Sequence, residues 1–291
     1  MHAEAIERIT AIERSIDTAA LVYSDVCYWP LVRLRLWSVL MSRLVLGKKS
    51  GGEKVANTGP AWADVGAVGA EALGAADLGL VKATGTTPKF GARCDALFFA
   101  RPEEYVEKTP AGAFAKFIDS LFERTPNARK LELADPRTLG FARLHPSLFL
   151  ELSRAAEGVR FDPPGALSNF DALSAAALKH ADVGLDPADL TADMGKIFYF
   201  ARIFEKVLRR MTPRALVLSV YYHPVGMAWM LAARRAGVTS IDLQHGRLGP
   251  HHGLYTDLTV APPEGYALMP DRVWCWGTRT VGDIARANAS A

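Results

Sequence analysis

Histidine is concentrated in one short stretch of this sequence. The segment TSIDLQHGRLGPHHGLY, residues 239–255, contains three of the seven histidines: His245, His251 and His252. Imidazole serves as a metal ligand, as a general acid or base near neutral pH, and as a hydrogen-bonding group in turns. Three interpretations therefore compete: a metal site, a catalytic or binding loop above a sheet, and a turn that happens to contain histidine.

A metal site finds little support in the spacing of these residues. No acidic or cysteine partner accompanies the three histidines at the spacing of a tetrahedral site, and the turn at Gly249-Pro250 directs the two ends of the segment apart. We therefore expect no bound metal and no cofactor.

Other common chemistries lack their motifs. The sequence holds no GxSxG nucleophile elbow, and Ser219 lies inside an apolar run. No GxGxxG follows an expected strand, and no phosphate-binding loop with its lysine is present. These observations argue against serine-nucleophile, dinucleotide-dependent and kinase chemistry.

The loop interpretation rests on position in the chain. Gln244, His245 and Gly246 directly follow an expected strand at 239–243. A histidine at a strand end can exchange hydrogen bonds with a phosphate or a sugar hydroxyl near neutral pH. The glycine after it allows a positive φ or a close backbone approach to a ligand. The plainer alternative is a histidine that only caps the turn.

A second polar and aromatic group follows the expected strand 215–221. There Pro224 suits the first turn of a helix, and Tyr221 is expected to pack against its neighbours. Binding residues concentrate on loops, and a surface loop is expected beyond Gly249-Pro250. Four residues of this turn and that loop are expected to contact a ligand: Tyr222, His223, His252 and Tyr255.

The elements that must position these residues alternate between strand and helix. Short apolar runs predict buried strands at residues 94–101, 130–134, 215–221, 239–243 and 272–277. Helical spacing predicts helices at residues 113–125, 194–211, 223–237 and 280–289. Between the Asp135-Pro136 turn and Asp193 the pattern is looser and more helical.

Apolar strands separated by amphipathic helices predict an α/β fold, a Rossmann-like parallel sheet with helices on both faces. Ligands of such sheets bind beyond the carboxyl ends of the strands. We therefore expect three loops to meet at one edge of the sheet, at residues 221–223, 244–246 and 276–277.

The chain divides into three zones. Residues 1–46 form an N-terminal helical segment that Pro30 breaks or restarts. Residues 47–91 are rich in glycine and alanine and are expected to be a linker or mobile insertion, because they hold few large apolar residues. Residues 92–291 form the Rossmann-like domain.

The N-terminal segment carries an apolar stripe interleaved with arginines: Trp29, Leu31, Leu34, Trp37 and Leu40. Charged residues interrupt the stretch, so it is not expected to span a membrane. Two alternatives remain. The stripe could lie on an anionic bilayer surface, or it could pack on the core while the arginines extend to water.

Composition limits which binding partners and which cellular location are expected for this protein. The 34 basic and 31 acidic residues give a formal charge of +3, which is too balanced to indicate nucleic-acid binding and which suits phosphorylated or lipid-linked substrates. Cys27, Cys94 and Cys275 have no paired spacing, so neither a disulfide framework nor a zinc ribbon is expected. No secretory signal is visible. We expect a cytoplasmic protein, with the inner face of the cytoplasmic membrane as an alternative location.

Three segments carry a resemblance to a known family: YYHPVGMAWMLAARRAGVTSIDLQHG, HHGLY and MPDRVWCWG. Together they resemble the second half of the amino-terminal domain of GT-B-type glycosyltransferase-like proteins of bacterial capsule, O-antigen and related surface-polysaccharide synthesis. In those proteins a strand-end Gln-His-Gly is followed by a His-x-x-Tyr loop and by a strand that ends in Trp/Phe-Gly. The early CYWPLVRLRLW is similar to a Trp-Pro-x-x-Arg segment near the start of some of them. The match covers residues 215–277.

The resemblance implies two Rossmann-like domains that face a cleft, with the acceptor largely on the first and a nucleotide-sugar donor largely on the second. It implies transfer of a sugar from that donor to a glycan or lipid-linked acceptor, with His245 in a catalytic or phosphate-contacting role. Gln244 and Gly246 shape the same edge in this picture. After Gly277 only one further helix is expected. We therefore expect the donor-binding domain to be missing and the chain alone to show no turnover.

Other functions share this architecture. A nucleotide-sugar epimerase or a glycerol-phosphate transferase would also place histidine at such an edge. A non-catalytic binding or scaffold domain would use Gln244-His245-Gly246 only as a structural turn. The sequence leaves these alternatives open.

Overall fold

The computed structural model describes residues 2–46, 80–81, 93–105, 107–133, 142–150, 152, 156, 165–249, 251–259, 261–262 and 264–288. The expected linker at 47–91 lies outside the described residues except for Leu80–Val81, which form a strand. The expected turn at Asp135-Pro136 also lies outside them.

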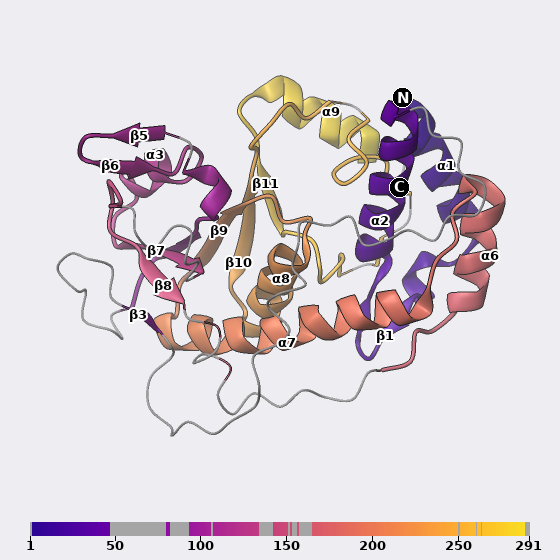
Figure 1. Cartoon of the computed structure of the whole chain (residues 1–291), viewed down its shortest axis with the longest axis horizontal. Helices are drawn as coiled ribbons and strands as arrows, with labels where there is room; N and C mark the ends of the chain where they lie inside the picture. Colours follow the sequence, from indigo (N-terminus) through magenta and orange to yellow (C-terminus); the bar gives the residue numbers. More distant parts are fainter. Residues whose placement is uncertain are drawn as a thin grey trace.

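The structure contains a seven-stranded sheet, seen in the left half of Figure 1. Its strands are β3 (Leu80–Val81), β4 (Ala96–Phe99), β7 (Ala128–Leu133), β8 (Leu148–Leu150), β9 (Ala215–Ser219), β10 (Thr239–Leu243) and β11 (Arg272–Trp274). They lie in the order β11-β10-β9-β4-β7-β8-β3. The six strands from β11 to β8 are parallel, and β3 pairs with β8 in the antiparallel sense. The predicted α/β fold with a parallel sheet is therefore confirmed.

Five of the parallel strands coincide with predicted strands, whereas β8 does not. It lies in the region that was predicted to be helical. Its three residues, Leu148–Leu150, are too few to show the alternation that distinguishes a strand from a helix.

The strand order is that of a doubly wound sheet. From the central pair, β4 leads outward to β7 and β8, whereas β9 leads outward to β10 and β11. The loops that leave β4 and β9 therefore diverge to opposite sides of the sheet. Such a switch point is where open α/β sheets bind their ligands.

Alternate residues of β4 face two different layers. Leu97 and Phe99 face a core that includes α7 (Pro187–Met211) and α8 (Pro224–Ala236), and the ring of Phe99 lies 5.3 Å from that of Trp229. On the other side, Phe98 packs against Phe122 of the short helix α3 (Asp119–Phe122). The sheet is thus covered on both faces, as period-two alternation requires.

The elements around α3 differ from the prediction. A helix was predicted over residues 113–125, but the chain first forms a hairpin of β5 (Glu107–Thr109) and β6 (Gly112–Phe114). Only four residues of the predicted helix are helical, in α3. Tertiary pairing with β5 overrides the helical spacing of this segment.

The long helices follow the prediction more closely. α7 begins at Pro187 rather than at Met194, because the side chain of Asp186 accepts a hydrogen bond from the N–H of Ala188 and caps the helix there. α8 begins at Pro224 with His223 as its N-terminal cap and ends before Gly237. The last helix, α9 (Thr278–Asn288), follows β11.

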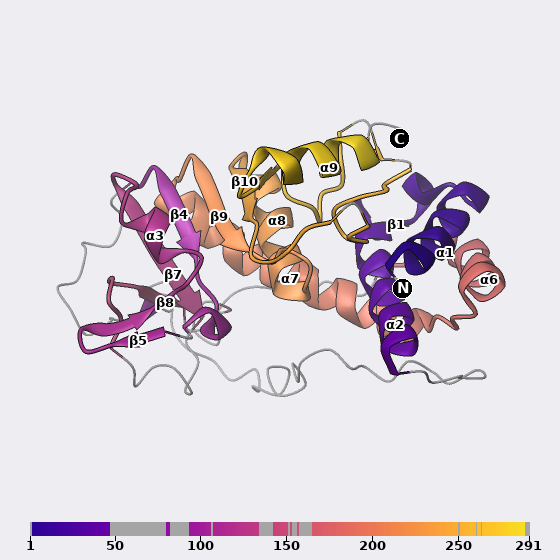
Figure 2. The ribbon, with the colours of Figure 1, turned by 90° about the horizontal axis from the view of Figure 1, so that it is seen from above.

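The N-terminal segment contains two helices, α1 (His2–Ser15) and α2 (Trp29–Leu46). Between them lie the 3-10 turn η1 (Thr18–Ala20) and a hairpin of β1 (Val22–Tyr23) and β2 (Val26–Cys27). Pro30 stands in the first turn of α2. Figure 2 shows α1, α2 and α6 (Phe170–Ala181) at one end of the molecule and α3 at the other.

The apolar stripe of α2 packs on the protein itself. Trp29, Leu31 and Leu40 are buried, and Leu34 and Trp37 pack, partly buried, against the same core. The expectation that the arginines extend to water is wrong for one of them: the side chain of Arg33 is 2% exposed and forms a buried ion pair with Glu13. Membrane contact through this segment stays a prediction.

No described helix combines the length and the apolarity needed to cross a bilayer.

Candidate functional site

The candidate site lies at the carboxyl edge of the sheet, around the switch point between β4 and β9. The turn after β9 is held in an unusual backbone conformation. Val220 has a φ of +62°, which is rare for a β-branched residue. A Cβ at Gly226 would lie 2.4 Å from the carbonyl oxygen of Tyr221, so only glycine fits there. The sequence from Val220 to Gly226 therefore builds a tight, strained connection at the site.

His223 has a structural task in this turn. Its Nδ1 accepts a hydrogen bond from the N–H of Gly226 at 3.2 Å and so caps α8. Burial, with the nearby charge of Arg101, lowers the pKa of His223 to about 3. The imidazole is therefore neutral at physiological pH and held by the helix it caps.

Tyr222 and His245 form a pair across two neighbouring strand ends. The hydroxyl of Tyr222 lies 2.8 Å from Nε2 of His245, and both side chains are half-buried. Nδ1 of His245 lies 3.3 Å from the carbonyl oxygen of Leu243, which can only accept a hydrogen bond. The proton of the neutral ring therefore belongs on Nδ1, which leaves Nε2 to accept from Tyr222. Burial lowers the pKa of His245 below its ordinary value, so the ring is uncharged near pH 7.

Gln244 shapes this edge through its side-chain hydrogen bonds. The buried amide of Gln244 donates to the carbonyl of Gly246 at 2.9 Å and accepts from the N–H of Trp276 at 2.8 Å, which joins the ends of β10 and β11. The positive φ that Gly246 would allow is not adopted, and a Cβ there would meet no protein atom within 4 Å. A close approach of this backbone to a ligand stays a prediction. The Gln244 side chain, rather than glycine geometry, holds this turn.

The loop beyond β10 brings two more predicted residues to the edge. His252 is half-buried, with its ring 5.8 Å from that of Tyr222. Burial, together with the proximity of His245, lowers the pKa of His252 to about 4. The expectation of a surface loop is wrong for Tyr255, which is 3% exposed and donates its hydroxyl proton to the carboxyl of Asp242. His251, by contrast, is exposed.

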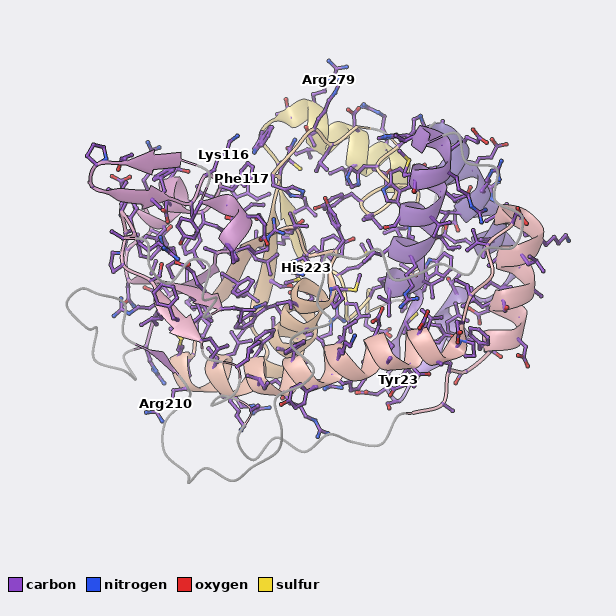
Figure 3. The ribbon with its side chains drawn as sticks, viewed as in Figure 1. Tyr23, Lys116, Phe117, Arg210, His223 and Arg279 are labelled. Atoms are coloured by element: carbon purple, nitrogen blue, oxygen red, sulfur yellow. The ribbon has the colours of Figure 1, made fainter. Side chains whose placement is uncertain are left out.

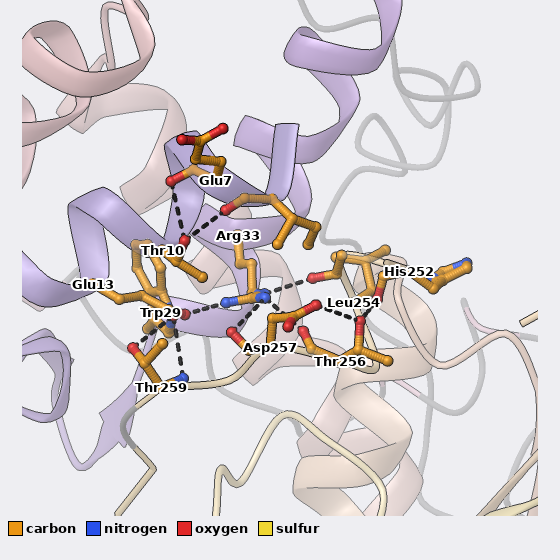
Figure 4. Close-up of polar contacts among 12 residues, drawn as sticks. Glu7, Thr10, Glu13, Trp29, Arg33, His252, Leu254, Thr256, Asp257 and Thr259 are labelled. Atoms are coloured by element: carbon orange, nitrogen blue, oxygen red, sulfur yellow. Dashed lines mark hydrogen bonds and ion pairs between the residues drawn. The ribbon is translucent and has the colours of Figure 1, made fainter. Parts of the chain in front are cut away.

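The N-terminal helix α2 fastens this loop to the rest of the molecule (Figure 4). Arg33 donates to the carbonyl oxygens of Gly253 at 2.5 Å, Thr256 at 2.7 Å and Asp257 at 3.1 Å. Its remaining partner is the carboxylate of Glu13 on α1. One buried guanidinium thus joins both N-terminal helices to the loop that carries the histidine.

Glu13 completes this arrangement. Its Oε1 also accepts from the indole N–H of Trp29 at 2.8 Å, and its Oε2 accepts from the hydroxyl of Thr259 at 2.8 Å. We call this group the anchor network: Glu13, Trp29, Arg33, Gly253, Thr256, Asp257 and Thr259. Both carboxylate oxygens of Glu13 are hydrogen-bonded, as burial of a charge requires.

Trp37 adds a packing contact to the same loop. Its ring stacks on that of His252 at 6.0 Å, and a Cβ at Gly253 would lie 2.2 Å from the indole. Helix α2, which contains Trp29, Arg33 and Trp37, therefore holds the loop of His252 in place at the candidate site.

Sequence reasoning missed the residues that leave β4. Arg101 directly precedes the 3-10 turn η3 (Pro102–Glu104), and its Nε lies 3.6 Å from Oε1 of Glu104. Glu104 is 2% exposed and accepts a hydrogen bond from the hydroxyl of Ser219 at 2.5 Å. The pairing of β4 with β9 places these residues together, and no motif in the sequence announces that pairing. One signal in the sequence could have indicated a buried carboxyl group at this edge: Asp242 is the single charged residue of the apolar strand 239–243.

Two buried carboxyl groups at this edge have raised pKa values. Burial raises the pKa of Glu104 to about 7, partly offset by Ser219, and raises that of Asp242 to about 7, partly offset by Tyr255. Within the described residues, Oε2 of Glu104 and Oδ1 of Asp242 have no hydrogen-bond partner at ordinary geometry. Buried polar atoms of this kind are uncommon, and functional sites are one place where they occur.

A metal site is not assembled here. Over the part of the chain that the structure describes, no three side chains of His, Cys, Asp or Glu are arranged to hold a metal ion. This edge instead holds uncharged imidazoles, phenol hydroxyls and two carboxyl groups whose pKa values are about 7. Such a set exchanges protons and hydrogen bonds with hydroxyl groups.

A scan against protein-family models finds no match, and a search of curated proteins finds no relative of this chain. The class of protein is therefore defined by its fold: an α/β protein with a parallel, doubly wound sheet. Its candidate site lies at the switch point of that sheet.

Proposed function

We propose that this chain is a glycosyltransferase-like domain that binds a glycan acceptor and takes part in transferring a sugar to it from a nucleotide-sugar donor. The observation that carries the proposal is the Tyr222–His245 pair at the carboxyl edge, 2.8 Å apart. Nε2 of the neutral His245 is a hydrogen-bond acceptor, and an acceptor of this kind is what removes the proton from an attacking sugar hydroxyl.

The arrangement suggests how the proton would move. A substrate hydroxyl that donates to the phenolic oxygen of Tyr222 can lose its proton to that oxygen as the Tyr222 proton passes to Nε2 of His245. The imidazole then carries one positive charge, and the Leu243 carbonyl that accepts from Nδ1 stabilises it. In this proposal His245 is the base and Tyr222 is the group that touches the acceptor.

The resemblance of residues 215–277 to surface-polysaccharide glycosyltransferase-like proteins supports the same assignment. Such transfer requires the donor and the acceptor to be held together with water excluded. The test therefore supplies donor and acceptor together.

The test is an assay of nucleoside diphosphate release. The protein is incubated with uridine, cytidine, guanosine and thymidine diphosphate sugars, with and without a pool of bacterial polysaccharide fragments. We expect release that depends on the acceptor with one donor, and we expect His245→Ala to lower its rate by about 100-fold or more. His251→Ala, which removes the exposed neighbouring histidine, should leave the rate unchanged.

Two results would count against the proposal. One is the absence of acceptor-dependent release with every donor. The other is a His245→Ala variant that turns over like the parent. Sugar binding without turnover would instead support the alternative of a non-catalytic binding domain.

A further inference from the structure

Five half-buried rings follow one another along the carboxyl edge. We call them the aromatic row: Trp37, His252, Tyr222, His245 and Phe117. The centroid separations of successive rings are 6.0, 5.8, 5.7 and 6.2 Å. The row crosses the edge from α2 to the turn after β6, and its five rings come from four segments of the chain, since His245 and His252 both follow β10.

Figure 3 shows where the row ends. Phe117 lies above the strand ends, on the side of the sheet away from α7, with Lys116 beside it. The ammonium group of Lys116 is 5.5 Å from the ring of Phe117. The other end is Trp37 on α2, which packs against Gly253. The two ends of the row are thus held by different parts of the fold: Phe117 by the turn after β6, and Trp37 by the N-terminal helix α2.

The layer beneath the row is closed. Tyr221 and Tyr255 are each buried, and their rings lie 5.5 Å apart. The hydroxyl of Tyr221 donates to the carbonyl of Leu254, and that of Tyr255 donates to Asp242. This buried layer supports two rings of the row: both tyrosines lie against Tyr222, and Tyr255 lies against His252.

The row is amphipathic and uncharged along its middle. The lowered pKa values of His245 and His252 keep both imidazoles neutral near pH 7. Ring faces offer apolar surface, whereas ring nitrogens and the Tyr222 hydroxyl offer hydrogen bonds at the edges. A sugar presents the complementary pattern: a C–H face that packs on a ring and hydroxyls around its rim.

A single-stranded nucleic acid would need cations along the row. Aromatic platforms for nucleic acids are lined with cations that follow the phosphates. Here Lys116 stands at one end of the row. The charge of Arg101 acts on Tyr222 and His245 near the middle, but its guanidinium is directed to the carboxyl of Glu104, 3.6 Å away. None of the five rings is charged near pH 7, so the row fits a neutral chain of sugar rings better than a polyanion.

We propose that the aromatic row is an extended binding surface for a carbohydrate chain, with several consecutive sugar units of an acceptor glycan packed on successive rings. This inference rests on the proposed function and deepens it, because it names an oligosaccharide rather than a single sugar as the acceptor. Trp37 and Phe117 are its outer contacts: the ring of Phe117 adjoins that of His245 at 6.2 Å, whereas His252 separates Trp37 from the Tyr222–His245 pair.

The test measures how affinity depends on chain length. The protein is applied to an array of bacterial capsular and O-antigen polysaccharides together with their one- to six-unit fragments. We expect at least one glycan to bind, with affinity that rises from one unit to four. Phe117→Ala should lower the affinity for the longer fragments about tenfold and should lower that for a single sugar by less.

Two variants keep this test decisive. Trp37→Phe preserves a ring over Gly253, so it should fold and lose only part of the length dependence. Trp274→Ala removes a tryptophan that is 54% exposed and outside the row, so it should bind like the parent. A length dependence that survives Phe117→Ala overturns the inference, as does the absence of binding across the array.

The two proposals can fail separately. Acceptor-dependent transfer to single sugars, with no gain for longer fragments, keeps the transferase and overturns the extended surface. Length-dependent glycan binding without nucleoside diphosphate release keeps the surface and removes the transferase.

Discussion

The anchor network and the carboxyl edge both bury charged or titratable groups, yet they treat them in opposite ways. Glu13 and Arg33 are almost fully buried, and the anchor network supplies a partner for both oxygens of the carboxylate. Glu104 and Asp242 are buried as deeply, but each keeps one oxygen without a hydrogen bond at ordinary geometry among the described residues. A saturated network holds a structure together, whereas an unsaturated one leaves groups whose protonation can change.

The two regions also differ in whether they contribute by holding a loop in place or by the chemistry of their side chains. The anchor network holds the loop of His252 from a distance, through backbone carbonyls that any sequence would offer. The carboxyl edge uses side chains whose identity matters. Substitutions in the two regions should therefore differ in what they change.

The largest expected effect is on stability, from Arg33→Met. This change leaves the buried carboxylate of Glu13 without its cation and should lower the free energy of unfolding by about 3–5 kcal/mol. Urea unfolding followed by circular dichroism measures it. The matched control is Arg8→Met, which breaks an exposed i,i+4 pair with Glu4 and should cost about 0.5 kcal/mol or less. Equal losses in the two variants would mean that the anchor network contributes no more than a surface pair.

The next effect is a pH dependence that comes from Glu104 and Asp242. Each pKa is raised to about 7 in the folded state, above its value in the unfolded chain, so the folded state holds more protons between about pH 4 and 7. Stability should therefore fall as pH rises through this range, by up to about 1.4 kcal/mol per pH unit for each group. The loss should level off above pH 7.

Amide variants test this directly. Glu104→Gln and Asp242→Asn cannot ionise, so their unfolding free energies should depend less on pH than that of the parent. Unfolding in urea at pH 4.5, 5.5, 6.5 and 7.5 gives the comparison, with the exposed Asp171→Asn as control. Curves for Asp242→Asn and the parent that run parallel would show that this carboxyl is ionised throughout.

The smallest expected effect on stability is that of Tyr222→Phe. It removes one hydrogen bond to a half-buried imidazole and should cost about 1 kcal/mol. Nitrogen-15 NMR of the histidine rings should show the parent His245 with its proton on Nδ1 at pH 7. A proton on Nε2 would reverse the direction of the Tyr222 hydrogen bond and remove the proposed proton path.

Several elements were predictable because they are decided locally. Pro224 and Gly237 mark the two ends of α8, and TSIDL coincides with β10. The hairpin β5–β6 and strand β8 were not predictable, since each exists only through pairing with a partner strand. The same holds within the site: Tyr222, His245 and His252 were found from their place after strands, whereas Glu104 and Arg101 needed the pairing of β4 with β9.

The sequence by itself determined the α/β alternation and the strand-end position of Gln244-His245-Gly246, because apolar periodicity and helix-terminating residues act over a few residues. Only the tertiary structure decided which strand ends are neighbours, that Gln244 is a tether and Tyr255 a buried support, and that Trp37 and Phe117 extend one row of rings. The physical reason is that burial and long-range contacts depend on the whole fold. Burial and long-range contacts set the pKa of each group and decide which residues are its neighbours. Residues more than 200 positions apart, such as Arg33 and Gly253, come into contact only in the folded protein.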